Sequence, residues 1–323
     1  MLSIPYTAQN FKPHMGPQLT GSHALTASWE ELVWSAITVG KLGIAELFSH
    51  GWYSLSDAIV RSHMVYANLR QTPSRFEKSA LYDSLDPTEK GATSYFVGMM
   101  AAKLVAARLF DTPWLFHLSR FKKGGGKLAL NGNSQPDLIG LNNTRDWIVI
   151  EAKGRTNGFS SDALSKAKDQ TRKLRKINGQ FPALRIGIQA YFSPSLEIMI
   201  DDPEEFDADA VDIIAEQRDL LQGYYSFAHS VTKGSNDIRT IHGRQFTFHK
   251  VEDIGLTIGL DRRIHLSFDQ SNILSIVGEL RRRDEPAVQQ DGALTMFPDG
   301  LVIQLDDRWT KSRMSHQPGM RNR

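Results

Sequence analysis

Hydrophobic residues recur at helical spacing in the first quarter of the chain. Ser28 and Glu31 form a capping-box pattern, which predicts a helix from there to about Ser49. Two more helices are predicted before residue 85 by the same spacing. Residues 1–25 lack this period and contain several Pro, Gly and His residues, so they predict an irregular arm. We therefore expect a helical N-terminal region over residues 1–85.

A more apolar helix is predicted to begin at Asp86-Pro87. Asp is a favoured N-cap residue, and Pro suits the first helical position. Only two charged residues occur between Tyr95 and Phe110, and several Gly and Ala residues keep the surface of this segment thin. Such a helix is typical of a protein interior, where it can pack closely on a sheet.

Strand-like segments follow this helix and enclose one further helical pattern. β-Branched and aromatic residues between turn residues favour strands, whereas spacing of three and four residues favours a helix. The predicted order is one interrupted strand (114–118 and 127–130), two strands (136–141 and 147–153), a helix (161–178) and two more strands (185–192 and 196–200). With the preceding helix, these elements predict an α/β core over residues 86–203.

The composition changes after residue 200. Residues 201–219 hold nine acidic side chains and a single basic one. Helical and strand-like patterns then alternate to about residue 305, and the tail from Lys311 is basic. We expect a mixed α/β C-terminal region over residues 204–323.

The overall composition excludes several classes of protein. The chain has 323 residues, of which 41% are hydrophobic and 23% charged, as in ordinary globular proteins. It has no apolar run long enough to cross a membrane, and its first residues lack the apolar segment of a secretory signal. Cysteine is absent, which excludes disulfides, thiolate metal sites and cysteine nucleophiles and is consistent with the cytoplasm, the compartment we expect. The net charge of +2 does not by itself indicate nucleic-acid binding.

Candidate chemistry gathers on two neighbouring predicted strands. Asp137 begins one strand, and Glu151 and Lys153 lie near the end of the next. Side chains two apart on a strand point to the same face, so Glu151 and Lys153 project together, and pairing of the two strands would bring Asp137 to Glu151. Converging carboxylates favour a bound cation such as Mg²⁺, and a neighbouring lysine can hold an attacking water. No serine-hydrolase elbow, zinc-protease helix or dinucleotide fingerprint occurs in the chain.

Pro136-Asp137, thirteen intervening residues and Glu151-Ala152-Lys153 resemble the signature of the PD-(D/E)XK nuclease superfamily. The order of the predicted elements is also similar to the αβββαβ core of that superfamily. The resemblance implies a restriction-endonuclease-like fold and Mg²⁺-dependent hydrolysis of nucleic acid, most often DNA, with Mn²⁺ as a substitute. It implies that Asp137, Glu151 and the carbonyl of Ala152 hold the metal and that Lys153 orients the nucleophilic water.

This resemblance covers roughly residues 86–203 and leaves alternatives open. It implies restriction or phage-defence work, with a homodimer or a defence-system partner as the associated assembly. The alternative from a different class is a nucleic-acid-binding or assembly subunit that keeps the fold and does not cleave. A surface hairpin carrying an ordinary Glu–Lys pair is the alternative without a site.

Two further residues are candidates for supporting the site. Many relatives in the superfamily carry an additional acidic residue on the first core helix, which corresponds here to Glu89. The position of Glu89 also suits a helix cap, so both interpretations stay open. Gln170 lies on the predicted helix after Lys153, where some branches carry a supporting Gln. The glycine-rich loop Lys122–Lys127 does not match a phosphate-binding loop and favours a turn.

Basic residues concentrate on the segment that follows Lys153. Between residues 153 and 176 there are eight basic and two acidic side chains, and such surfaces attract nucleic-acid phosphates. The alternative is that this basic face balances the acidic stretch at 201–219. The candidate nucleic-acid contacts are Lys166, Arg172, Lys173 and Lys176.

Overall fold

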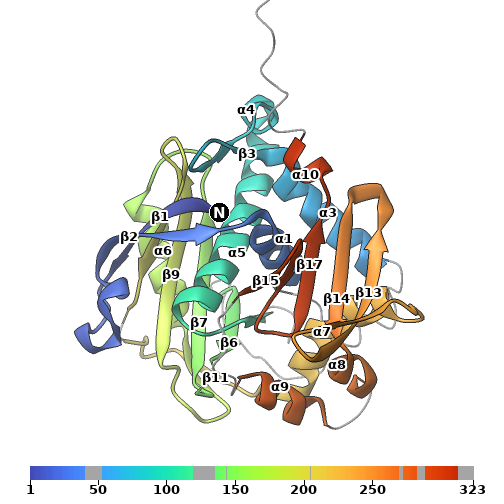
Figure 1. The fold of residues 1–323 in the computed structure, drawn as a ribbon. Helices are drawn as coiled ribbons and strands as arrows, with labels where there is room; N and C mark the ends of the chain where they lie inside the picture. The colour runs from blue at the N-terminus through green and yellow to red at the C-terminus, as the bar shows by residue number, and fades with distance from the viewer. Residues whose placement is uncertain are drawn as a thin grey trace, which may run out of the picture.

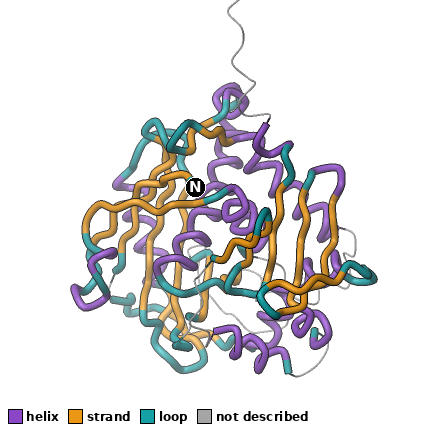
Figure 2. Tube along the Cα trace, viewed as in Figure 1, coloured by secondary structure: helices purple, strands orange, loops and turns teal. Residues whose placement is uncertain are grey.

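Two large β-sheets, two short two-stranded sheets and the helices that pack on them make up the described part of the protein (Figures 1 and 2). The structure is a computed structural model that describes residues 1–40, 53–118, 135–142, 144–203, 205–268, 272–281 and 288–311. In Figure 1 a seven-stranded sheet lies on the left and a six-stranded sheet on the right. Helices α1 (Trp29–Thr38), α3 (Tyr53–Asn68) and α5 (Pro87–Leu109) lie between the two sheets. The fold is therefore mixed α/β, as the sequence predicts.

The seven-stranded sheet combines strands from distant parts of the chain. β1 runs parallel to β10, and β7 runs parallel to β9, whereas the other neighbours are antiparallel. The order of its strands is β2 (Gly21–Ala27), β1 (Leu2–Gln9), β10 (Leu196–Asp201), β9 (Leu184–Phe192), β7 (Trp147–Gly154), β6 (Leu138–Leu141) and β5 (Trp114–His117). The predicted strand residues 127–130 and the loop Lys122–Lys127 lie outside the described residues.

The prediction of an irregular arm over residues 1–25 is wrong. β1 and β2 occupy most of this segment, joined by the short 3₁₀ turns Pro13–Met15 and Pro17–Leu19. Side chains along β1 alternate between buried and half-buried, the period expected of a strand. Pro5 obscures this pattern in the sequence, because Pro is rare inside sheets. It is tolerated here because β1 pairs with β10 only from Tyr6 onward.

The rest of the N-terminal region is helical with one short ribbon. Ser28 and Glu31 form the predicted capping box at the start of α1. α1 ends at Thr38, earlier than predicted, and residues 41–52 lie outside the described part of the chain. The remaining elements are β3 (Leu69–Gln71), β4 (Phe76–Lys78) and α4 (Ala80–Ser84). The region 1–85 therefore contains strands as well as helices.

Helix α5 packs closely on β7, as its small residues predict. A Cβ on Gly154 would lie 1.6 Å from the carbonyl oxygen of Ser94, and one on Gly98 would lie 2.7 Å from the backbone nitrogen of Gly154. Only glycine fits at such a distance between backbones. Asp86 caps the helix by accepting hydrogen bonds from the N–H groups of Thr88 and Glu89. The contact fixes α5 against the end of β7.

The helix predicted over 161–178 is shorter than expected. α6 covers Ser161–Arg172, and the next residues form strand β8 (Leu174–Ile177), which pairs in parallel with β11 (Val211–Ile213). The guanidinium of Arg185 donates hydrogen bonds to the carbonyls of Leu174 and Arg175, at 3.1 and 2.9 Å. These contacts satisfy carbonyl groups that a continued helix would use internally, so the helix ends before them.

The C-terminal part forms the second sheet, which is antiparallel throughout its described strands. The order of its strands is β12 (Ile238–Ile241), β13 (Arg244–Val251), β14 (Leu256–Asp261), β17 (Leu301–Leu305), β16 (Leu294–Met296) and β15 (Gln289–Asp291). The helical elements of this part are α7 (Gln217–Thr232), the 3₁₀ turn Glu252–Ile254, α8 (Arg262–Ser267), α9 (Ile273–Arg281) and α10 (Arg308–Lys311).

One hydrophobic core joins this second sheet to the first. The same buried cluster contains residues of α1, of β5 to β7, of α7 and of β14 and β17. At its centre the ring of Trp34 stacks on Phe297 with a centroid distance of 4.5 Å and an interplanar angle of 3°. The C-terminal sheet therefore packs on the helices that cover the first sheet.

Candidate functional site

The antiparallel pair of β6 and β7 brings Asp137 to Glu151. Leu138 pairs with Ile150, so the residues beyond this pair face each other at the same end of the two strands. The backbone N–H of Asp137 donates to Oε2 of Glu151 at 2.8 Å, and the N–H of Ala152 donates to Oδ2 of Asp137 at 3.2 Å. The two predicted carboxylates therefore converge, as the spacing of the motif requires.

Lys153 projects on the same side as Glu151 and joins both strands to α6. Its Nζ lies 2.5 Å from Oε1 of Glu151 and 2.6 Å from Oε1 of Gln170. The Nε2 of Gln170 donates to the carbonyl of Gln135 at 3.2 Å. The sequence predicted Gln170 as a supporting residue but not Gln135, which takes part through its backbone carbonyl. The only feature of the sequence that could have indicated Gln135 is its position directly before Pro136.

Helices α5 and α6 cover opposite faces of β7. Glu151 pairs with Gly187 on β9, and a Cβ at Gly187 would touch the side chains of Leu164 and Ala167 on α6. Ala152 instead belongs to the core cluster that α5 fills. The carboxylate of Glu151 and the amine of Lys153 therefore lie on the α6 face.

Burial changes the charge that Glu151 carries. Its side chain is almost wholly removed from solvent, which raises the pKa of this carboxyl to about 8. The negative charge of Asp137 raises the pKa further, whereas Lys153 and the N–H of Asp137 act in the opposite direction. A carboxylate with these neighbours would be stabilised by a divalent cation shared with Asp137.

Pro136 leaves the carbonyl of Ala152 without a strand partner. Continuing the register of Leu138 with Ile150 places position 136 opposite Ala152. The N–H of Ala152 points toward Asp137, and the carbonyl of a strand residue lies on the same side as its N–H. Since Pro136 has no N–H, it cannot donate a ladder hydrogen bond to this carbonyl. Within the described strands, this carbonyl therefore lacks a donor from β6 and could serve as a ligand.

The residues present fit a magnesium ion. Mg²⁺ is commonly held by one or two carboxylates and keeps several waters. Asp137 and Glu151 supply two carboxylates, and within the described residues Oδ1 of Asp137 accepts no hydrogen bond. No cluster of three or more His, Asp or Glu side chains suited to a metal occurs in the part of the chain that the structure describes. Asp137, Glu151 and the Ala152 carbonyl would hold Mg²⁺, with Mn²⁺ as a chemically similar substitute.

Glu89 does not join this group. It is exposed at the N-terminus of α5, and its Oε2 accepts a hydrogen bond from the N–H of Asp86 at 3.1 Å. α5 covers the face of β7 opposite to Glu151. The capping interpretation of Glu89 is confirmed, and among the residues that the structure describes no contact joins Glu89 to the site.

The predicted basic residues divide between different environments. Lys166 is exposed on α6, and Arg172 is half-buried at the end of the helix. Lys173 lies beyond the helix and forms ion pairs with Asp207 at 3.0 Å and Asp209 at 3.1 Å. Acidic residues of the 201–219 stretch therefore offset the charge of Lys173, which is the alternative that the sequence left open.

Lys176 is also separated from the helix. It lies on β8, and its Nζ lies 4.6 Å from the ring centroid of Phe181, a cation–π contact. Neighbouring Arg175 forms an ion pair with Asp212 at 2.8 Å. Lys173 and Lys176 are therefore not on the exposed face of α6, contrary to the prediction.

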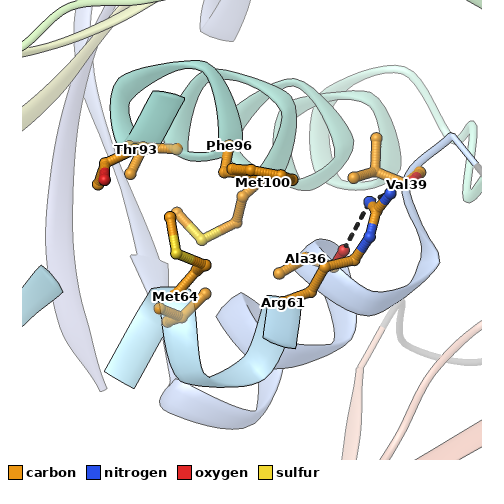
Figure 3. A pocket seen from close by; sticks show the side chains of 9 residues that line it. Ala36, Val39, Arg61, Met64, Thr93, Phe96 and Met100 are labelled. Atoms are coloured by element: carbon orange, nitrogen blue, oxygen red, sulfur yellow. Dashed lines mark hydrogen bonds between the residues drawn. The ribbon is translucent and has the colours of Figure 1, made fainter. Parts of the chain in front are cut away.

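A hollow lies between α1, α3 and α5 (Figure 3). Its lining is apolar apart from Arg61 and Thr93. The guanidinium of Arg61 donates to the carbonyls of Ala36 and Val39 at 3.3 and 3.0 Å, so it caps the end of α1. Among the described residues, the lining has no carboxylate or histidine that could act as an acid or base beside Thr93.

Comparison with protein-family models gives no match for this chain, and comparisons with curated proteins and with solved structures give none either. Among the described residues, every helix is too short or too polar to cross a membrane. Any function must therefore be argued from the geometry of Asp137, Glu151, Lys153 and Gln170.

Proposed function

We propose that this protein hydrolyses phosphodiester bonds of nucleic acid with the help of Mg²⁺. The observation that carries the proposal is the convergence of Asp137, Glu151 and Lys153 at one end of the β6–β7 pair. Within the chain segment of the seven-stranded sheet, the order α5, β5, β6, β7, α6 and β9 supports a restriction-endonuclease-like core, because it follows the αβββαβ order that the motif resemblance implies. The short strand β8, which lies between α6 and β9 in the chain, pairs with β11 in a separate sheet. DNA is the proposed substrate.

Each residue has a distinct task in this proposal. The carboxylates of Asp137 and Glu151 and the carbonyl of Ala152 would hold the metal, which when bound would supply Lewis-acid stabilisation of the phosphate charge. Lys153 holds the attacking water and offsets the negative charge that grows on the phosphate. Gln170 holds the amine of Lys153 in place through a 2.6 Å hydrogen bond.

Water provides the oxygen that forms the new bond to phosphorus. The attacking water releases one proton to solvent. The bond between phosphorus and the leaving sugar oxygen breaks, and that oxygen takes up a proton from solvent. Lys153 contacts Glu151 and Gln170 on one side, and 28% of its side chain remains exposed on the other. It can therefore reach a water molecule in the solvent beside the metal ligands.

A cleavage assay tests the proposal. Supercoiled, linear and single-stranded DNA are incubated with the full chain in Mg²⁺, Mn²⁺ or EDTA. We expect cleavage that needs the metal and is lost in Lys153→Ala and Asp137→Asn. The matched control is Lys233→Ala, an exposed lysine at the end of α7, which should cleave like the wild type.

The other outcomes contradict the proposal in different ways. Cleavage that survives in Asp137→Asn would assign the reaction to another site or to a contaminant. Binding of DNA without cleavage by the wild type would favour the non-cleaving binding or assembly subunit instead.

A further inference from the structure

The loop between β7 and α6 is held firmly at the same end of the sheet as the candidate site. The N–H of Arg155 donates to the carbonyl of Ala190 at 2.9 Å. The buried side chain of Gln189 accepts from the N–H of Ser160 and donates to the carbonyl of Ser160, both at 2.8 Å. These bonds fasten both ends of the loop to β9.

This loop presents an aromatic ring to solvent. Phe159 is 44% exposed, although the backbone beside it is fixed. One side of its ring packs on Tyr191, with a centroid distance of 5.8 Å and an interplanar angle of 61°. Burial and the neighbouring charge of Glu197 raise the pKa of Tyr191 to about 12, so its phenol stays neutral behind Phe159. Tyr191 therefore holds one side of the Phe159 ring, and another part of the ring is exposed to solvent.

Phe159 lies on the catalytic face of the sheet. Lys153 pairs with Gln189 on β9, and Tyr191 follows two residues later on that strand. Side chains two apart on a strand share a face, so Tyr191 extends from the face that carries Lys153. Phe159, which packs on Tyr191, therefore lies near the end of β9 on this side.

Basic residues lie on both sides of Phe159 in the sequence. Arg155 follows Lys153 by two residues, and Lys166 is exposed on α6. Proteins that bind single strands combine cations that follow the phosphates with aromatic side chains on which bases stack. A base inside a duplex is already stacked on both faces, so an exposed phenylalanine selects unpaired nucleotides.

We infer that Phe159 stacks on an unpaired nucleobase and that the site therefore prefers nucleic acid with a single-stranded segment. This inference rests on the proposed function, because it names the form of its substrate. Arg155 and Lys166 contact the phosphates beside the stacked base.

Binding in EDTA tests the inference without cleavage. The probes are a fluorescein-labelled single strand of about twenty nucleotides and a blunt duplex of the same sequence. Fluorescence anisotropy measures the binding of each probe to the full chain. Phe159→Ala should weaken single-strand binding about tenfold and leave duplex binding unchanged, whereas Phe159→Trp should retain it. Phe181→Ala is the matched control, because Phe181 is 56% exposed but lies before the start of β9, at the other end of that strand. Thermal unfolding of each variant establishes that it is folded.

Three results would overturn the inference. Phe159→Ala could bind the single strand as tightly as the wild type, it could lose duplex binding equally, or Phe181→Ala could weaken single-strand binding to the same extent. None of these affects the proposed function, which depends on metal-dependent cleavage and its loss in Asp137→Asn. If the wild type does not cleave but Phe159→Ala gives the expected binding result, the protein has a single-strand-binding surface and the proposed hydrolysis is wrong.

Discussion

Lys103 of α5 donates a hydrogen bond of 2.6 Å to the hydroxyl of Tyr224 of α7, and both residues are buried. Tyr224 in turn donates to Oδ2 of Asp299 at 2.5 Å, and the indole N–H of Trp34 donates to the same oxygen at 2.8 Å. Lys103 also bonds the carbonyl of Pro113. Burial lowers the pKa of Lys103 to about 7, and the charge of Asp299 opposes this change. The network ties the N-terminal helices and the first sheet to the C-terminal sheet.

Removing one member of this network should destabilise the whole chain. Asp299→Asn should lower the free energy of unfolding by about 3 kcal/mol, because it leaves Lys103 buried without a compensating charge. The double variant Lys103→Met, Asp299→Asn should lose less than the sum of the two single variants, by about 1 kcal/mol or more. Urea unfolding measures the free energy of unfolding of the wild type, the two single variants and the double variant.

A surface pair provides the control for this cycle. Asp237 and Arg239 form an exposed ion pair at 2.6 Å, and Asp237→Asn should cost less than about 1 kcal/mol. Additive effects of the Lys103 and Asp299 variants would show that the network does not couple the two parts.

The buried carboxyl of Glu151 should make the metal-free protein less stable as the pH rises. Its pKa rises from an ordinary value of 4.5 to about 8 in the folded protein, so the folded state holds this proton more tightly. The stabilisation from this group is complete below about pH 4.5 and is lost as the pH approaches 8. Unfolding in EDTA across this range should show a loss in the wild type that Glu151→Gln lacks.

Two comparisons make this result specific. Glu205→Gln changes an exposed carboxyl away from the site and should follow the wild type. Added Mg²⁺ should oppose the loss in the wild type, since an ion bound only by the folded state stabilises it. A parallel pH dependence of the wild type and Glu151→Gln would contradict the assigned effect of burial.

Lys166 and Lys173 should contribute differently to nucleic-acid binding. Lys173 is already paired with Asp207 and Asp209, whereas Lys166 is exposed on α6. Lys166→Ala should weaken binding and reduce the dependence of log affinity on log salt by about one unit, because one phosphate contact is lost. Lys173→Ala should leave both quantities nearly unchanged. Equal effects of the two variants in salt titrations would contradict the difference between an ion-paired Lys173 and an exposed Lys166.

Gly154 should be intolerant of a side chain. A methyl group there would overlap the carbonyl of Ser94 on α5, so Gly154→Ala should destabilise the protein by about 3 kcal/mol. Apart from its chain neighbours, no described residue has an atom within 4 Å of a Cβ at Gly158, four residues later, so Gly158→Ala should change stability by less than about 1 kcal/mol. Thermal unfolding of the two variants checks the difference, and similar melting temperatures would contradict the close packing of α5 on β7.

Local features of the fold could be predicted from the sequence. The capping boxes at Ser28 and Asp86 each use residues three apart, so the information lies within one helical turn. Asp137 and Glu151 could be placed together because their strands are joined by a short turn, and such neighbours pair antiparallel. The hydrogen bond between Lys153 and Gln170 joins residues on consecutive elements.

Contacts between distant segments decided the rest. β1 pairs with β2 nearby but joins the large sheet through β10, almost two hundred residues later, and α6 ends early where Arg185 takes the carbonyls of Leu174 and Arg175. The residues next to Lys103 in the chain do not predict that Lys103 will lie close to Asp299. The sequence by itself determined caps, strand alternation and the chemistry of the motif, since these depend on neighbours along the chain. Only the tertiary structure decided which charges are buried, paired or exposed, because burial and ion pairing depend on segments that meet only after folding.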